Sequence, residues 1–178
     1  LGLALAIGIP MGILASVKRG SLVDSAAMVL AVLGQATPYF WLGLMLILVF
    51  SVLFPLLPTG GRGDWRHLVL PGITLGTFFA ASVARLTRSS MLEVLGVEYV
   101  LTARAKGLGR FVVTLKHAFT NALIPVVTLV GLQIGGLLGG AVVTETIFAW
   151  PGVGRLIIFS ISYRDYPVVQ AAVFLLAM

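Results

Sequence analysis

Five long stretches without a charged residue decide what kind of protein this sequence encodes. They cover residues 1–17, 25–54, 68–84, 118–144 and 166–178. A helix of roughly 20 apolar residues crosses the hydrocarbon core of a bilayer. Charged residues make up only 10% of the 178 residues, whereas soluble domains have about 25%, and the mean hydropathy is +1.09. The sequence excludes a soluble domain and predicts an all-α, polytopic membrane helical bundle with about five spans.

The first and last stretches are shorter than a full span, and residue 1 is leucine. We therefore expect residues 1–178 to form one transmembrane domain that is partial at both ends. A signal peptide carries its basic residues before the apolar run, but Lys18 and Arg19 follow the first stretch. The first stretch is thus interpreted as part of a span. The sequence has no cysteine, which excludes disulfides and thiolate metal sites within it.

When successive loops are assigned alternately to the two sides of the membrane, the Lys and Arg residues are divided unevenly between these sides. Four lie on one side, namely Arg62, Arg66, Arg155 and Arg164. Eight lie on the other, namely Lys18, Arg19, Arg85, Arg88, Arg104, Lys106, Arg110 and Lys116. Short cytoplasmic loops are enriched in Lys and Arg, so the side with eight is predicted to be cytoplasmic. The net charge of +6 follows from this membrane topology, and nucleic acid is not expected as a partner.

The uncharged stretches lack the residues that several functional classes require. An ion-coupled carrier or channel, the main alternative, keeps ionisable residues inside its spans, and these stretches have none. No catalytic constellation lies at membrane depth, and no glycine-rich phosphate-binding loop is present. Asp64 and His67 alone are too few for a metal site. We predict a transport subunit that is not an enzyme, holds no cofactor or metal, and takes its energy from another polypeptide.

Glycines recur at four-residue intervals in several spans, which lets helix backbones approach closely. The strips are Gly8 with Gly12, Gly72 with Gly76, Gly131 with Gly135 and Gly139, and Gly136 with Gly140. Polar residues in the spans, such as Gln35 and Asn121, suit either a wet path or hydrogen bonds between helices. The sequence leaves open whether the strips pack within one subunit or at a sliding or subunit interface.

Residues 98–125, EYVLTARAKGLGRFVVTLKHAFTNALIP, lie between two spans on the predicted cytoplasmic side. Small residues alternate with Arg104 and Lys106, and Gly107 follows them, which predicts a short helix that ends near Gly107. Such a helix can press into a groove of a cytoplasmic partner. Arg104 and Lys106 can pair with carboxylates of that partner or with anionic lipid headgroups.

The run TARAKGLGR followed by HAFTNALIP resembles the cytoplasmic EAA-type loop of ABC importer permeases. The similarity is to the subfamily of dipeptide, oligopeptide, nickel and glutathione importers. Two later segments extend it, GGAVVTETIFAWPGVGR at residues 139–155 and RDYPVVQ at residues 164–170. Leu101 stands at the glutamate position of the EAA pattern and Thr102 at its first alanine, so no salt bridge from that glutamate is expected.

The resemblance implies a type I ABC importer transmembrane domain in a bacterial-type inner membrane. Residues 85–117 would form the cytoplasmic loop, and its coupling helix would bind an ATPase subunit through Ala103, Arg104, Ala105, Lys106, Gly107, Leu108 and Gly109. The implied partners are a second homologous permease subunit, two ATP-binding subunits and an extracytoplasmic substrate-binding protein. That binding protein or the outer gate would involve Glu145, Phe148, Trp150, Pro151 and Gly152, with a stiff apolar edge at Phe148, Trp150 and Pro151.

The implied function is import of dipeptides, oligopeptides or a related small solute by alternating access, driven by ATP hydrolysis on the separate subunits. Nickel and glutathione permeases share these motifs, so both remain alternatives within the subfamily.

Overall fold

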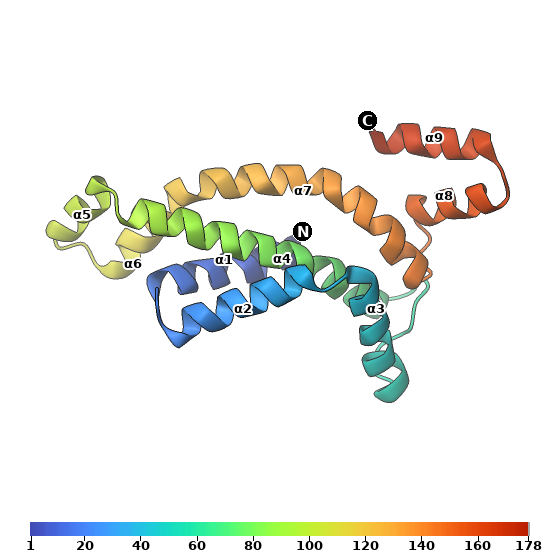
Figure 1. The fold of residues 1–178 in the computed structure, drawn as a ribbon, viewed down its shortest axis with the longest axis horizontal. Helices are drawn as coiled ribbons and strands as arrows, with labels where there is room; N and C mark the ends of the chain where they lie inside the picture. Colours follow the sequence, from blue (N-terminus) through green and yellow to red (C-terminus); the bar gives the residue numbers. More distant parts are fainter. Residues whose placement is uncertain (178) are drawn as a thin grey trace. The chain divides into compact units, whose positions relative to one another are not determined.

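The computed structural model describes the backbone of residues 1–177 and the side chains of residues 1–137 and 141–176. Every regular element in this part is a helix, which confirms the predicted all-α class. In chain order the elements are α1 Gly2–Val17, α2 Leu22–Ala36, α3 Tyr39–Ile47, η1 Leu48–Leu53, α4 Arg66–Leu95, α5 Glu98–Ala105, α6 Arg110–Val112, η2 Val113–Phe119, α7 Thr120–Ile147, α8 Val153–Ser162 and α9 Tyr166–Ala177, where η marks a π-helix (Figure 1).

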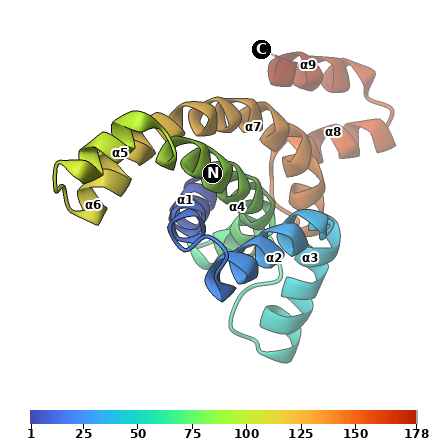
Figure 2. The same cartoon turned by 60° about the vertical axis from the view of Figure 1, so that its left-hand side comes forward.

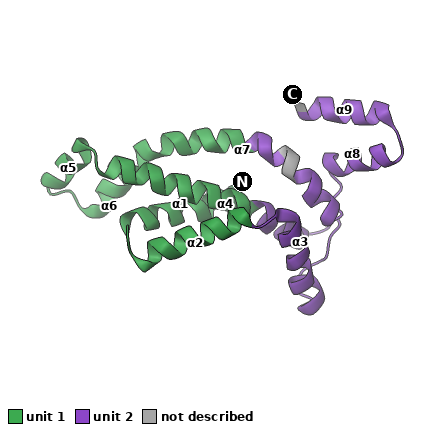
Figure 3. Cartoon of the chain, viewed as in Figure 1, with its two compact units in different colours: residues 1–36, 76–133 green, residues 37–75, 134–178 purple. Residues whose placement is uncertain are grey.

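The chain divides into two compact units (Figure 3). The first consists of residues 1–36 and 76–133, and the second of residues 37–75 and 134–178. In the first unit, α1 and α2 lie beside α4, and α5 and α6 lie beyond the end of α4, as Figures 1 and 2 agree. In the second unit, α8 and α9 pack against each other.

Close helix packing in the first unit depends on two glycines of α1. A Cβ atom at Gly8 would lie 2.7 Å from the carbonyl oxygen of Ala80 in α4, and one at Gly12 would lie 2.6 Å from that of Ala84. Both distances are shorter than van der Waals contact, so only glycine lets α1 approach α4 this closely. The Gly8–Gly12 strip therefore packs within one subunit.

The strip on α7 behaves differently, because its glycines face open space in the described chain. A Cβ atom at Gly131, Gly135 or Gly136 would meet nothing within 4 Å. Gly139 and Gly140 lie outside the described side chains. This strip is thus available for packing against something other than the described residues of this chain.

Two helices among the described residues are long and apolar enough to cross a membrane by length and composition, α4 and the continuous helix over Arg110–Leu137. Residues 25–54, one of the five uncharged stretches, do not form one continuous helix, because α2 ends at Ala36 and α3 begins at Tyr39. Pro38 lacks an amide hydrogen and disfavours a helical Thr37, which explains this break. The α2–α3 pair adds a third span if it counts as one, while α1, α8 and α9 are apolar but shorter.

A buried ion pair joins the start of α2 to α4 within the first unit. The guanidinium of Arg88 donates to both carboxylate oxygens of Asp24, from Nε to Oδ1 at 2.5 Å and from Nη2 to Oδ2 at 2.7 Å. Only 6% of the Asp24 side chain is exposed. The amide of Gly20 donates a further bond to Asp24 at 3.0 Å. Both charges lie just outside the uncharged stretches, at the predicted cytoplasmic end.

This pair generates a prediction about stability. Asp24→Ala leaves the Arg88 charge without its carboxylate, so we expect the melting temperature Tm of the detergent-purified protein to fall by about 5 °C or more. The double variant Asp24→Ala/Arg88→Met should recover most of that loss, because neither charge is then stranded. Gln35→Ala, which removes a hydrogen bond to the exposed Arg85, is the control and should change Tm little. A double variant no more stable than Asp24→Ala would contradict the interpretation.

Candidate coupling and outer-turn sites

The short helix α5 ends as the sequence predicts, at a glycine in the left-handed conformation. Gly107 has φ +79°. Its amide donates to the carbonyl of Arg104 at 3.0 Å, and the amide of Leu108 donates to the carbonyl of Ala103 at 3.4 Å. These two bonds form the Schellman motif, which satisfies carbonyls that the end of a helix leaves free. The turn after α5 is therefore held in one geometry by backbone bonds.

The predicted partner-binding residues share this turn, and most of them are exposed. Ala103 is 7% exposed and faces the inside of the unit. The other six are exposed, namely Arg104, Ala105, Lys106, Gly107, Leu108 and Gly109. Within residues 85–117, the predicted cytoplasmic loop, residues 85–95 continue α4 and η2 leads directly into α7. The exposed turn is thus a compact feature between two long helices.

A small apolar core fixes α5 to those helices. Val100 and Ala103 of α5 pack with Met91 of α4, Val113 of η2 and Ala122 of α7. Val100 and Met91 are completely buried, and Val113 is 1% exposed. Interiors packed in this way transmit displacement because they resist compression. A force on the exposed face of α5 would therefore act on the adjacent ends of α4 and α7.

A polar link reinforces this attachment. The amide nitrogen of Asn121 in α7 donates to the hydroxyl oxygen of Tyr99 in α5 at 2.7 Å, and the Tyr99 hydroxyl donates to the carbonyl of His117 at 3.2 Å. Asn121 thus makes a hydrogen bond between helices, one of the two roles considered for it. Tyr99 and Val100 were not among the predicted site residues, although both lie in residues 98–125, the segment between two predicted spans.

The residues predicted for the outer gate or the binding-protein contact lie at the end of α7 and in the turn between α7 and α8, together here called the outer turn, which belongs to the second unit. In this turn, Glu145 caps α8. A carboxylate oxygen of Glu145 accepts a hydrogen bond from the amide of Arg155 at 2.9 Å. This amide is in the first turn of α8. The N-cap residue of α8 is Gly152, which has no side chain that could accept a hydrogen bond from this turn. A Cβ atom at Gly152 would overlap the Glu145 carboxylate. Glycine at this position therefore makes room for the cap.

Phe148 lies inside the second unit, with 1% of its surface exposed. Its carbonyl accepts a hydrogen bond from the amide of Gly61 at 2.7 Å, which connects this turn to the loop between η1 and α4. Its ring lies against Gly43 of α3, where a Cβ atom would approach it to 3.3 Å. Of the expected apolar edge, Pro151 is exposed and Trp150 is half-buried. Phe148 is not part of an exposed edge, because its side chain is buried inside the unit.

Asp64 and His67, the two residues considered as metal ligands, bind each other. Nδ1 of His67 lies 2.9 Å from Oδ1 of Asp64, and this hydrogen bond lowers the pKa of the Asp64 carboxyl. Within the described residues, no three His, Cys, Asp or Glu side chains come together as a metal site would need. The two side chains stabilise the loop that precedes α4.

The Glu145 cap generates a prediction of non-additivity. Glu145→Ala removes the cap, and Gly152→Ala displaces the carboxylate, so each should raise hydrogen exchange of the Arg155 amide by about fivefold, as expected for a lost N-cap. The double variant should exchange no faster than either single variant, because the same bond is lost. Glu145→Gln keeps an acceptor oxygen and is the control. Multiplied effects in the double variant would show that the two residues act separately.

Known proteins resemble this chain over almost its whole length. It is 48% identical over 205 residues to the dipeptide transport system permease protein of Escherichia coli strain K12, covering 98% of this chain and 60% of the relative. It is 49% identical over 175 residues to the glutathione transport system permease protein of the same strain, covering 98% and 57%. The chain thus spans less than two thirds of these relatives. The family described as binding-protein-dependent transport system inner membrane component matches residues 8–178. The chain belongs to this family of inner membrane transport components.

Proposed function

We propose that the chain is a permease subunit of an ATP-driven importer, and that α5 with its following turn is the helix through which an ATPase subunit acts on it. The observation that carries this proposal is the pairing of an exposed face with a buried one on α5. Arg104 and Lys106 are exposed, while Val100 and Ala103 sit in a core shared with α4 and α7. A partner can bind the exposed face, and the core connects that face to the long helices.

The energy for transport comes from partner subunits in this proposal. The sequence holds no glycine-rich phosphate-binding loop, and the family name describes a component of a transport system that depends on a binding protein. Two ATP-binding subunits close on the coupling helices, and the permease pair alternates between inward-facing and outward-facing states. An extracytoplasmic protein delivers the substrate to the turn that contains Trp150 and Pro151. The free strip at Gly131 and Gly135 suits contact with the second permease subunit.

Short peptides are the proposed substrate class. The names of the two relatives specify dipeptide and glutathione, and glutathione is itself a small peptide. Nickel is the alternative within the subfamily, and the paired Asp64 and His67 do not favour it. Uptake by the reconstituted complex, measured for a panel of dipeptides, oligopeptides, glutathione and nickel, distinguishes these substrates. We expect peptides to be taken up, and uptake of nickel alone would contradict the proposal.

Replacing Gly107 tests the coupling role. Gly107→Leu places a side chain in open space on the exposed turn, where it obstructs partner binding. We expect membrane insertion to stay at the wild-type level, while substrate-stimulated ATP hydrolysis is lost and uptake falls by about tenfold or more. Both are measured on the complex in proteoliposomes.

Gly20 provides a matched control for this experiment. It also has a positive φ, +76° against +79° for Gly107, and a Cβ atom there also meets nothing within 4 Å. Gly20→Leu therefore introduces the same backbone strain outside the coupling turn. Uptake should remain near wild type in Gly20→Leu. Normal uptake in Gly107→Leu, or an equal loss in both variants, would contradict the proposal.

A further inference from the structure

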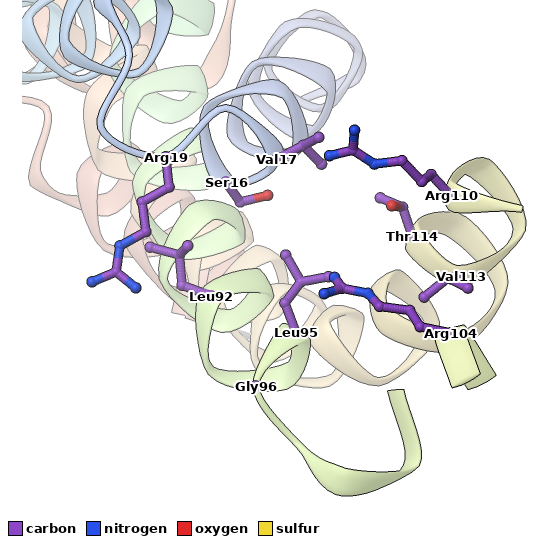
Figure 4. Close-up of a pocket in the computed structure, with 10 residues that line it drawn as sticks. All are labelled: Ser16, Val17, Arg19, Leu92, Leu95, Gly96, Arg104, Arg110, Val113 and Thr114. Carbon is purple, nitrogen blue, oxygen red and sulfur yellow. The ribbon is translucent and has the colours of Figure 1, made fainter. Parts of the chain in front are cut away.

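A pocket of about 370 Å³ lies within the first unit, among the end of α1, the end of α4, α5 and η2. Leu92, Leu95 and Val113 form part of its apolar lining. Arg104 and Arg110 enter it from the side of α5 and α6, and Figure 4 shows their guanidinium groups reaching across the opening toward α4 and α1.

The charged side chains that line this pocket are all positive. The guanidinium groups of Arg104 and Arg110 make no hydrogen bond or ion pair in the part of the chain that the structure describes. Arg19 also lines the pocket, although its side chain is directed away from the space (Figure 4). The described lining contains no Asp or Glu. Positive charges that face a shared space repel each other unless an anion lies between them.

A phosphate group matches this arrangement. Each guanidinium offers a planar fork of N–H donors, which pairs with phosphate oxygens through two charge-assisted bonds. The hydroxyls of Ser16 and Thr114 also line this space (Figure 4), and that of Thr114 can donate to a phosphate oxygen, whereas that of Ser16 already donates to the carbonyl of Ile13 at 2.7 Å. A phosphate here would connect α5, α6 and η2 through Arg104, Arg110 and Thr114.

The surroundings of the pocket favour a phospholipid as the source of that phosphate. Val17, in the pocket wall, is 40% exposed, and Phe111 and Val112, beside Arg110, are 75% and 40% exposed. Exposed apolar side chains next to a basic pocket suit acyl chains next to a headgroup. Basic pockets between helices at the cytoplasmic side of a membrane bind anionic headgroups, and this pocket lies on the side with eight Lys and Arg. We propose that Arg104 and Arg110 bind the phosphate of an anionic phospholipid at the base of the coupling helix.

This binding does not require an ATPase subunit, although Arg104 also belongs to the exposed coupling turn. The test therefore uses the full-length permease alone in detergent, so its outcome is independent of the coupling proposal. Native mass spectrometry measures the dissociation constant Kd for dioleoyl phosphatidylglycerol. The site variant is Arg104→Gln/Arg110→Gln. The matched control is Lys106→Gln/Lys116→Gln, which removes the same charge from exposed positions outside the pocket.

We expect the site variant to raise Kd for phosphatidylglycerol by about tenfold or more, and the control to leave it within about twofold. Thr114→Trp fills the pocket without changing its charge, and it should also weaken binding, which tests the site if the double variant fails to fold. Equal Kd values in the site variant and the wild type would overturn the proposal, as would equal weakening in both double variants. Displacement of the lipid by millimolar inorganic phosphate would overturn the assignment to a lipid.

Discussion

One face of α5 is buried against the neighbouring helices, and this burial fixes the position of the turn that follows α5. An eight-residue helix is too short to be stable alone in water. Val100 and Ala103 hold it by packing against residues of α4, η2 and α7, and the bond between Tyr99 and Asn121 adds a polar contact. The opposite face is then left exposed in a fixed orientation. Without this core, the basic turn would be a flexible loop that could not move the helices beside it.

The two units cap the ends of their short helices in different ways. In the first, the C-terminus of α5 is closed by backbone bonds at Gly107, which needs only a residue that tolerates a positive φ. In the second, the N-terminus of α8 is closed by the side chain of Glu145, and the N-cap position is glycine so that the carboxylate fits. Both turns that the family resemblance singles out are therefore held in one geometry by hydrogen bonds.

Much of this fold follows from patterns that act locally. Uncharged stretches indicate membrane helices, and the small residues before Gly107 indicate the end of α5. The glycine strips indicate close packing, but their period does not say which helix approaches, so the sequence alone does not predict the contact of Gly12 with α4. The break at Thr37 and the burial of Phe148 were also not predicted. A proline does not always end a helix, since Pro10 lies inside α1, so the sequence does not say that Pro38 would end α2. The burial of Phe148 depends on contacts with Gly43 and Gly61, which are distant in sequence.

Cysteine cross-linking tests directly whether an ATPase subunit binds the coupling turn, because residues 1–178 contain no cysteine. Lys106→Cys places a thiol on the exposed coupling turn, and Arg62→Cys places one on the predicted opposite side of the membrane. A short bifunctional thiol–amine reagent is applied to membranes that contain the assembled complex. We expect a cross-link from Lys106→Cys to an ATPase subunit and none from Arg62→Cys. No cross-link to the ATPase from position 106, or one from position 62 instead, would contradict it.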